Sequence, residues 1–224
     1  MAERALVLSV GCVALLACGG GSASPDGSLH GIDGSSACAA LTSYTVTFGS
    51  DAQTAFQQGS GTTGADSHYM QYTGKLDADA KYDQLVIELF AGIGTFAGVD
   101  IAPKPIPLAG DELQYKLCGA CVRVFAGVDD SLATVDQYYM ATGGTLQLTQ
   151  TSGDLQATLS NVAFTHVSIG SDFTSTPVGD CDTAIPALSI SAHIDLHTGS
   201  GSAALAPTPA PAYATAGILR HRYQ

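Results

Sequence analysis

The stretch QYYMATGGTLQLTQTSGDLQATLSNVAFTHVSIG, residues 137–170, decides the fold class of this chain. It is rich in Val, Leu, Thr and Tyr, and a Gly-Asp pair separates two runs that favour strands. In the second run Leu155, Ala157 and Leu159 alternate with polar residues, so their side chains share one face of a strand. Paired glycines at 143–144 interrupt the first run, which predicts a bulge or a bend there.

Similar runs recur along the chain at intervals of roughly 10–15 residues, with Gly or Asp turns between them and without a sustained helical period. We therefore predict an all-β fold: an antiparallel β-sandwich of about eight or nine strands with a jelly-roll-like arrangement. The three prolines in IAPKPIPL mark an extended connection that cannot donate to a strand ladder. The other expected strands lie at 43–50, 68–76, 84–92, 187–197 and in two runs around Gly119 within 112–127.

The N-terminus predicts export. An apolar run from Ala5 to Ala17 is about 13 residues long, too short for a membrane span but typical of a signal peptide. It ends in LLAC, which resembles the lipobox of bacterial lipoproteins. By this resemblance residues 1–17 are removed and Cys18 carries the lipids, while Gly19 favours the outer membrane as destination. The alternative is an ordinary signal peptide in which the Cys occurs by chance.

Composition divides the rest of the chain into three parts. Residues 18–37 are Gly/Ser/Asp-rich and form the lipidated Cys with a flexible tether, and residues 38–197 form one β domain. Residues 198–224 are Pro/Ala-rich and are expected to be a disordered tail. A net charge of −12 argues against a nucleic-acid partner, because nucleic acids bind basic surfaces. The expected partner is the membrane, reached through the lipid anchor.

Four of the six cysteines lie beyond the signal and lipidation segments, at Cys38, Cys118, Cys121 and Cys181. An even number in an exported chain predicts two disulfides. Four cysteines allow three pairings. Residues 119–120 could supply a tight turn that lets Cys118 and Cys121 close locally, which leaves Cys38 for Cys181. We favour this pairing, and the other two stay open.

The Cys-x-x-Cys pair also permits two other chemistries. A structural zinc site usually needs a second pair of ligands, which the sequence does not offer. A thiol oxidoreductase using Cys118 and Cys121 would place them at a helix N-terminus, whereas the following Val-Arg-Val-Phe favours a strand. Arg123 could lower a thiol pKa, so a thiol oxidoreductase is retained as an alternative function.

A second alternative comes from the last expected strand. His193, Asp195 and His197 point to the same side of that strand, and two imidazoles with a carboxylate are a plausible set of metal ligands. These residues would make the protein metal-binding or a metal-dependent enzyme; otherwise they are the solvated positions of an amphipathic strand. No cofactor other than such a metal is expected. Asp77, Asp79 and nearby acids lack the pattern of a calcium loop and are interpreted as a turn.

Three motifs carry a resemblance over about residues 38–195: CGACV at 118–122, ATGGTL at 141–146 and PVGDC at 177–181. With them the chain resembles a group of lipoproteins of myxobacteria and related bacteria to which no activity is assigned. The resemblance implies export, lipidation and a cysteine framework, and it transfers no catalytic residue. The sequence thus predicts a lipid-anchored cell-envelope protein, a non-catalytic binding or structural module whose ligand is unknown.

Overall fold

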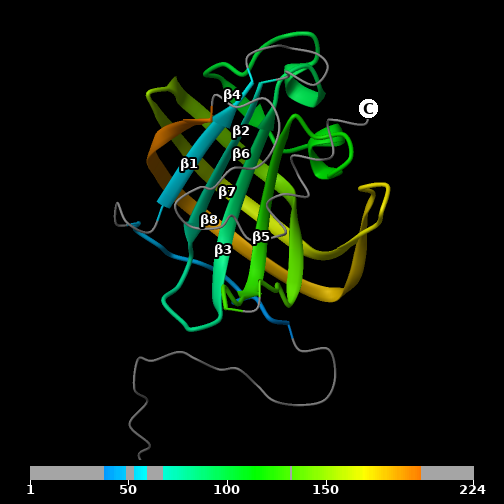
Figure 1. Ribbon diagram of the computed structural model, residues 1–224. Helices are drawn as coiled ribbons and strands as arrows, with labels where there is room; N and C mark the ends of the chain where they lie inside the picture. Colours follow the sequence, from blue (N-terminus) through cyan, green and yellow to red (C-terminus); the bar gives the residue numbers. More distant parts are fainter. Residues whose placement is uncertain (1–37, 49–52, 60–67, 132, 198–224) are drawn as a thin grey trace, which may run out of the picture. The chain divides into compact units, whose positions relative to one another are not determined.

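The computed structural model describes residues 38–48, 53–59, 68–131 and 133–197, all of which belong to one unit of the chain. The predicted signal peptide, the lipidated Cys18 with its tether and the tail 198–224 lie outside the described residues. Within the described part the fold is all-β, with eight strands and two short 3-10 helices, which confirms the predicted fold class and strand number (Figure 1). The strands are β1 (Gln53–Gln58), β2 (Tyr69–Lys75), β3 (Tyr82–Phe90), β4 (Pro105–Pro107), β5 (Ala120–Val128), β6 (Gln137–Ser152), β7 (Asp154–Ile169) and β8 (Ser175–His197), and the helices are η3 (Gly94–Phe96) and η4 (Gly110–Leu113).

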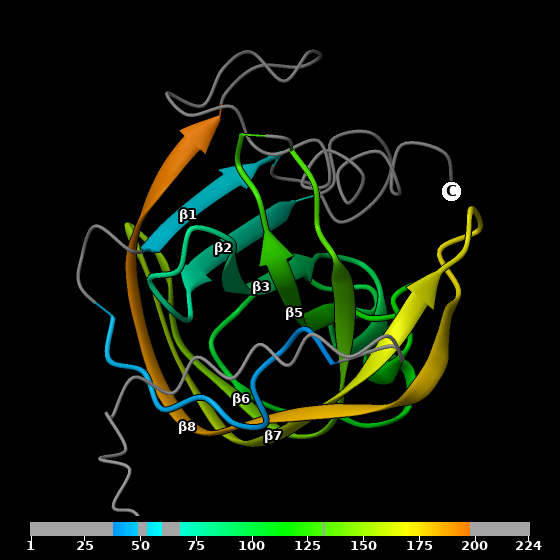
Figure 2. The same ribbon diagram turned by 90° about the horizontal axis from the view of Figure 1, so that it is seen from below.

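The strands form one sheet in the order β4-β6-β5-β3-β2-β1-β8-β7, and β6 pairs with β7 as well, so the sheet closes on itself. Seen along the strands, β1, β2, β3 and β5 lie opposite β6, β7 and β8, with the core between them as in a sandwich (Figure 2). Every pairing is antiparallel except that of β1 with β8, which makes the sheet mixed. Strands adjacent in the sequence are mostly adjacent in the sheet. The connectivity is therefore a meander, which corrects the jelly-roll-like arrangement expected from the sequence.

The interior is filled by the apolar positions that alternate along each strand. Leu85, Ile87 and Leu89 of β3 point inward, as do Leu155 and the other alternating positions predicted for β7. The aromatic side chains of the core are fully buried, including Tyr72, Tyr139, Phe96 and Phe164.

The paired glycines of β6 form the predicted irregularity. The register with β7 shifts on both sides of Gly143, and Gly144 has φ +109°. A Cβ atom on Gly144 would lie 2.6 Å from both the carbonyl oxygen of Asn161 and the Cα of Val162, so only glycine fits this close approach. Before this point β6 pairs with β5, and after it with β4. The bulge therefore lets one strand serve two neighbours.

Three expectations about strands are corrected. Residues 43–48 keep the predicted alternation, and Tyr44 is buried, but they join no ladder; the backbone N–H of Tyr44 donates to Ala184 (2.9 Å). The run before Gly119 is η4 followed by turns, in which the backbone N–H of Cys118 donates to Gln114 (2.9 Å). The strand β1 was not expected, because its sequence QTAFQQ is mostly polar. The proline-rich stretch contributes β4, which pairs with β6 alone. Proline has no backbone N–H to donate to a second neighbouring strand, so it suits such an edge position.

Candidate functional site: a buried polar cluster on the outer face of the sheet

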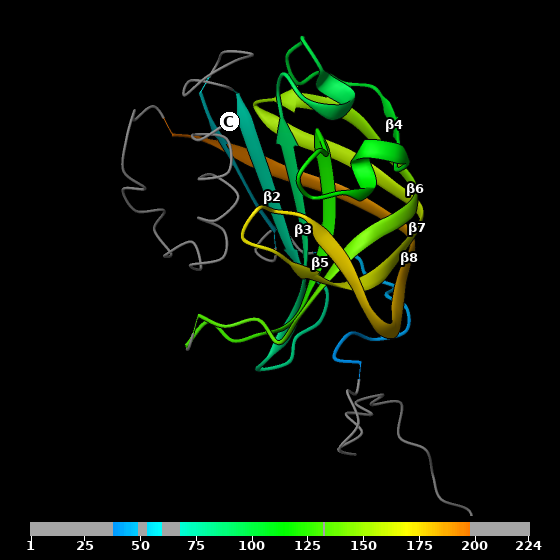
Figure 3. The ribbon, with the colours of Figure 1, turned by 90° about the vertical axis from the view of Figure 1, so that its right-hand side faces the viewer.

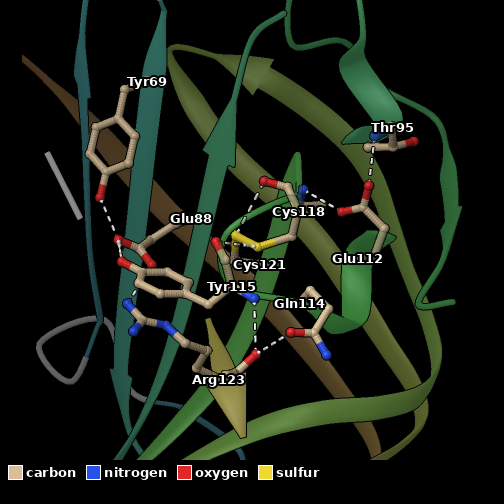
Figure 4. Close-up of a disulfide and its surroundings, with 11 residues drawn as sticks. Tyr69, Glu88, Thr95, Glu112, Gln114, Tyr115, Cys118, Cys121 and Arg123 are labelled. Atoms are coloured by element: carbon tan, nitrogen blue, oxygen red, sulfur yellow. Dashed lines mark hydrogen bonds and ion pairs between the residues drawn. A yellow bond between two sulfur atoms is a disulfide. The ribbon is translucent and has the colours of Figure 1, made fainter. Parts of the chain in front are cut away.

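Charged side chains lie buried on the outer face of the sheet. Alternation along β3 and β5 turns Glu88 and Arg123 away from the core, yet they are only 0% and 3% exposed. Glu88 lies opposite Cys121 in the register, and Arg123 is two residues further along β5. Tyr69 of β2 and Tyr115 complete what we call the outer cluster, next to the Cys118–Cys121 disulfide (Figure 4).

The outer cluster is held together by an ion pair and the two tyrosines. Nη2 of Arg123 donates to Oε2 of Glu88, while the hydroxyls of Tyr69 (3.1 Å) and Tyr115 (3.4 Å) donate to Oε1. The guanidinium also lies over the rings of Tyr115 and Phe125, 4.0 and 4.7 Å from their centroids. A buried charge is costly unless it is paired, and here Glu88 accepts three hydrogen bonds.

The local electrostatics keep Arg123 charged and Tyr69 neutral. Burial by itself would lower the pKa of Arg123, but the nearby Glu88 carboxylate, followed by Tyr115 and Tyr69, raises that pKa overall. Burial and then the Glu88 charge raise the pKa of Tyr69 well above its usual range. Tyr69 therefore acts as a hydrogen-bond donor to Glu88 and does not ionise at neutral pH.

A second layer of chain covers the outer cluster. The backbone N–H of Tyr115 donates to the Ser175 hydroxyl (3.1 Å), which in turn donates to the side chain of Gln114 (3.1 Å). The ring of Phe173, in the turn between β7 and β8, packs edge-on against Tyr115 at 6.2 Å. This turn lies in front of β3 and β5, next to the η4 segment (Figure 3). The cover thus joins two segments that are far apart in the sequence.

The pairing of cysteines favoured from the sequence is present. Cys118 bonds to Cys121 across a local turn, and Cys38 bonds to Cys181, 143 residues further on. Both cysteines of the local pair are fully buried against Tyr115 and other residues of the outer cluster. An active dithiol must meet its substrate at an accessible sulfur, so this burial favours a structural disulfide.

Glu112 fixes the turn that carries this disulfide. Its Oε1 accepts from the backbone N–H of Thr95 (2.6 Å), and its Oε2 accepts from that of Ala120 (2.6 Å). Burial is the main cause that raises the pKa of Glu112, and these hydrogen bonds offset it only in part. Gly119 is required here because a Cβ would collide with the carbonyl oxygen of Ile93. The carboxylate therefore holds η3 and the Cys-x-x-Cys turn together.

Asp83 plays a comparable part at the other end of β3. Its Oδ2 accepts from the Tyr44 hydroxyl (2.5 Å) and its Oδ1 from the backbone N–H of Gly127 (2.9 Å). Burial raises its pKa, and these two hydrogen bonds lower it in part. Asp77 accepts from the backbone N–H groups of Asp79 (3.1 Å) and Asp83 (3.0 Å), as in the acidic turn predicted from the sequence.

The three candidate metal ligands stay apart from this arrangement. His193, Asp195 and His197 all lie on the exposed side of β8, as the alternation predicts. Nδ1 of His193 lies 3.1 Å from Oδ1 of Asp154 on β7. Among the described residues no group of three or more His, Cys, Asp or Glu side chains could hold a metal ion, so these three do not assemble into a metal site.

Sequence reasoning missed Glu88 and Glu112 and gave Arg123 a different role. A signal was available: in VIELF and CVRVF a single charged residue stands between apolar residues on both sides. In a strand with one solvated face, the neighbours two positions away would be polar. Their apolar character shows that both faces are covered, and hence that the charge is buried.

No family model, no curated protein and no solved structure matches this chain. In the part of the chain that the structure describes, no helix has the length and apolar character to cross a membrane.

Proposed function

We propose that this protein is a lipid-anchored component of the bacterial cell envelope, at the outer membrane, whose β domain is a non-catalytic binding or structural module. The LLAC motif at Cys18, the short apolar run before it and the resemblance to lipoproteins of myxobacteria support the anchor. The two disulfides support a compartment outside the cytoplasm, where disulfides persist.

The observation that carries the proposal is the position of the Cys38–Cys181 disulfide. Cys38 follows directly on the tether 18–37, and Cys181 lies within β8, the longest strand. Thr183 donates to the carbonyl oxygen of Leu41 beside it, and Tyr44 is bonded to β8 and to Asp83. Any pull on the tether therefore reaches β8 through a covalent bond, a suitable arrangement for a domain held by its N-terminus.

The contacts of the outer cluster support a non-catalytic role. Glu88 and Arg123 are bonded to each other and to tyrosines, beneath a layer of chain, and the neighbouring disulfide is buried as well. Catalytic acids, bases and thiols act on a substrate within hydrogen-bond reach. Side chains that satisfy one another inside the fold instead stabilise it, which is the role we assign to this cluster.

Replacement of Cys18 tests the anchor. In cells that express the full chain, Cys18→Ser should move the protein from the membrane fraction to the soluble fraction and abolish labelling by a fatty-acid analogue. Cys12→Ser, inside the signal peptide, is the matched control and should leave both unchanged. Continued membrane association and labelling of the Cys18→Ser protein would refute the proposal.

The two alternative functions have separate readouts. A thiol oxidoreductase would reduce insulin with dithiothreitol as donor, and its Cys118–Cys121 pair would be alkylated after mild reduction of the folded protein. A metal protein would contain stoichiometric metal, which His193→Ala would remove. We expect neither activity nor stoichiometric metal in the purified protein; either result would replace the proposed function by the corresponding alternative.

A further inference from the structure

The closed sheet still contains strands with one unpaired side. Among the described residues β4 pairs with β6 and with no other strand, and β8 pairs with β1 only from Ile194 onward. Figure 3 shows β4 beside β6 at one border of the sheet. The unpaired side of a strand presents N–H and C=O groups that can pair with a strand of another chain. Both stretches are therefore places where a second copy could add to the sheet.

The unpaired side of β8 is covered by the chain itself. The backbone N–H of Tyr44 donates to the carbonyl oxygen of Ala184 (2.9 Å). Further along the same strand, the backbone N–H of Ser191 donates to Oε1 of Gln53 (3.2 Å). Backbone groups on this side of β8 thus already have partners within the molecule, and β4 is the stretch that needs another explanation.

Hydrogen bonds to β6 fix the direction of each backbone group in β4. The carbonyl oxygen of Lys104 accepts from the N–H of Leu148 (3.0 Å), and the N–H of Leu108 donates to the carbonyl oxygen of Gly144 (3.0 Å). In an antiparallel ladder only every second residue exchanges hydrogen bonds with a given neighbour. The even-numbered residues of this stretch therefore turn their backbone groups towards β6, and the odd-numbered residues turn theirs away from it.

Every odd-numbered position of this stretch is a proline, namely Pro103, Pro105 and Pro107. Proline has no backbone N–H, so the unpaired side of β4 offers carbonyl oxygens and no donor. The three proline side chains are exposed, whereas Ile106 and Leu108 between and beside them are buried in the core. Packing of the core therefore does not explain why these positions are prolines.

The missing donors make the addition of a strand to β4 unfavourable. Each hydrogen-bonded pair in an antiparallel ladder exchanges two bonds, and opposite a proline only one of them can form. The carbonyl oxygen of the incoming residue would lose its water without gaining a donor, which costs more than a typical hydrogen bond contributes. The carbonyl oxygens of β4, in contrast, remain bonded to water as long as the side stays open.

We propose that Pro103, Pro105 and Pro107 prevent β4 from pairing with the β4 strand of a second copy of this chain. Pairing of two identical edges is two-fold symmetric, so the central residue of each strand would lie opposite its own copy. The three prolines remove every donor from that contact. Their role is thus to keep this border of the sheet monomeric, and it is independent of what the domain binds.

Threonine in place of the prolines tests this role, because it restores the N–H and favours strands. In sedimentation velocity of the purified full chain, the wild type should keep the mass of a monomer over a concentration series. Pro103→Thr/Pro105→Thr/Pro107→Thr should approach about twice that mass, as a two-fold dimer implies. Pro105→Thr alone restores fewer donors and should dimerise at least about tenfold more weakly. Its side chain is exposed, so this single variant keeps the test open if the triple variant does not fold.

A matched control and a cross-link locate the contact. Pro186 is exposed on β8, between the two bonds that cover that strand, so Pro186→Thr should stay monomeric. Pro103→Thr/Pro105→Cys/Pro107→Thr should be cross-linked between copies by a short bismaleimide. The proposal is wrong if the folded threonine variants stay monomeric, or if Pro186→Thr associates as strongly as they do. It is equally wrong if the wild type already dimerises and Pro105→Cys alone cross-links its copies.

Discussion

The Cys38–Cys181 disulfide should contribute far more to stability than Cys118–Cys121, although both are single covalent bonds. A disulfide stabilises mainly by restricting the unfolded chain, and the effect grows with the length of the closed loop. The two sequence separations are 143 and 3 residues. In the chain-entropy treatment these lengths correspond to about 5 and about 1.6 kcal/mol at room temperature.

Packing raises both values, but by different amounts. Cys118 and Cys121 are both fully buried, so Cys→Ala at these two positions also loses core contacts, whereas Cys38 is exposed and only Cys181 is buried. Adding about 1 kcal/mol for each buried sulfur lost gives about 6 kcal/mol for the long-range pair and about 3.6 kcal/mol for the local pair. The ordering of the two variants therefore survives the correction.

The assay is urea unfolding of the soluble chain, followed by circular dichroism, for the wild type and the two double Cys→Ala variants. Cys38→Ala/Cys181→Ala should show the larger loss and also a larger m-value, because its unfolded state is less compact. Cys118→Ala/Cys121→Ala should keep the m-value of the wild type. If the local pair costs as much as the long-range pair, or if removal of Cys38–Cys181 costs less than about 1 kcal/mol, the reasoning is wrong.

Three further predictions concern buried polar groups and one glycine. Arg123→Met should cost about 3–5 kcal/mol because it leaves a charge buried without its partner, and adding Glu88→Met should recover most of that loss in urea unfolding. Burial raises the pKa values of Glu112 and Asp83, so the native state binds protons that the unfolded state releases. The free energy of unfolding should therefore rise as the pH falls from neutral through these raised pKa values. Glu112→Gln should flatten this pH dependence, and an unchanged slope in that variant would contradict the prediction. Gly144→Ala should destabilise by about 2 kcal/mol or more from its left-handed backbone and close contacts, measured by thermal unfolding, and a neutral effect would contradict the bulge geometry.

The sequence predicts the strands that alternate and misses those that pack by other rules. Leu155, Ala157 and Leu159 share a face because only one side of β7 is buried, so their period of two is visible. In β3 every residue is buried, so the alternation there separates two buried faces and does not by itself show which of them is the core. The polar strand β1 is recruited by its pairing with the next strand, β2, and with β8, which is distant in the sequence. Local pattern carries no information on such pairing.

The candidate site was predictable in part for the same reason. The Cys118–Cys121 pair follows from residue spacing and an even count of cysteines, which are local properties. The partners of Glu88 are not local. Tyr69 comes from β2 and Arg123 from β5, the two strands that flank β3 in the sheet, and Tyr115 comes from a segment that covers the outer face. His193, Asp195 and His197, the alternative metal ligands, occupy every second position of one strand, and among the described residues no group of three potential ligands converges as a metal requires.

The ion pair also explains how β3 and β5 keep their register, where apolar residues on both faces would otherwise permit a slip. A shift of either strand by one residue exchanges its two faces. Such a slip would place Arg123 in the core at the level of Leu85 or Ile87, without Glu88 and without the tyrosine hydroxyls. An unpaired buried charge costs several kcal/mol. This cost is much larger than the difference in apolar contacts between the native register and a shifted one. The pair therefore selects one register among the alternatives, and this selection gives the buried charges a structural role.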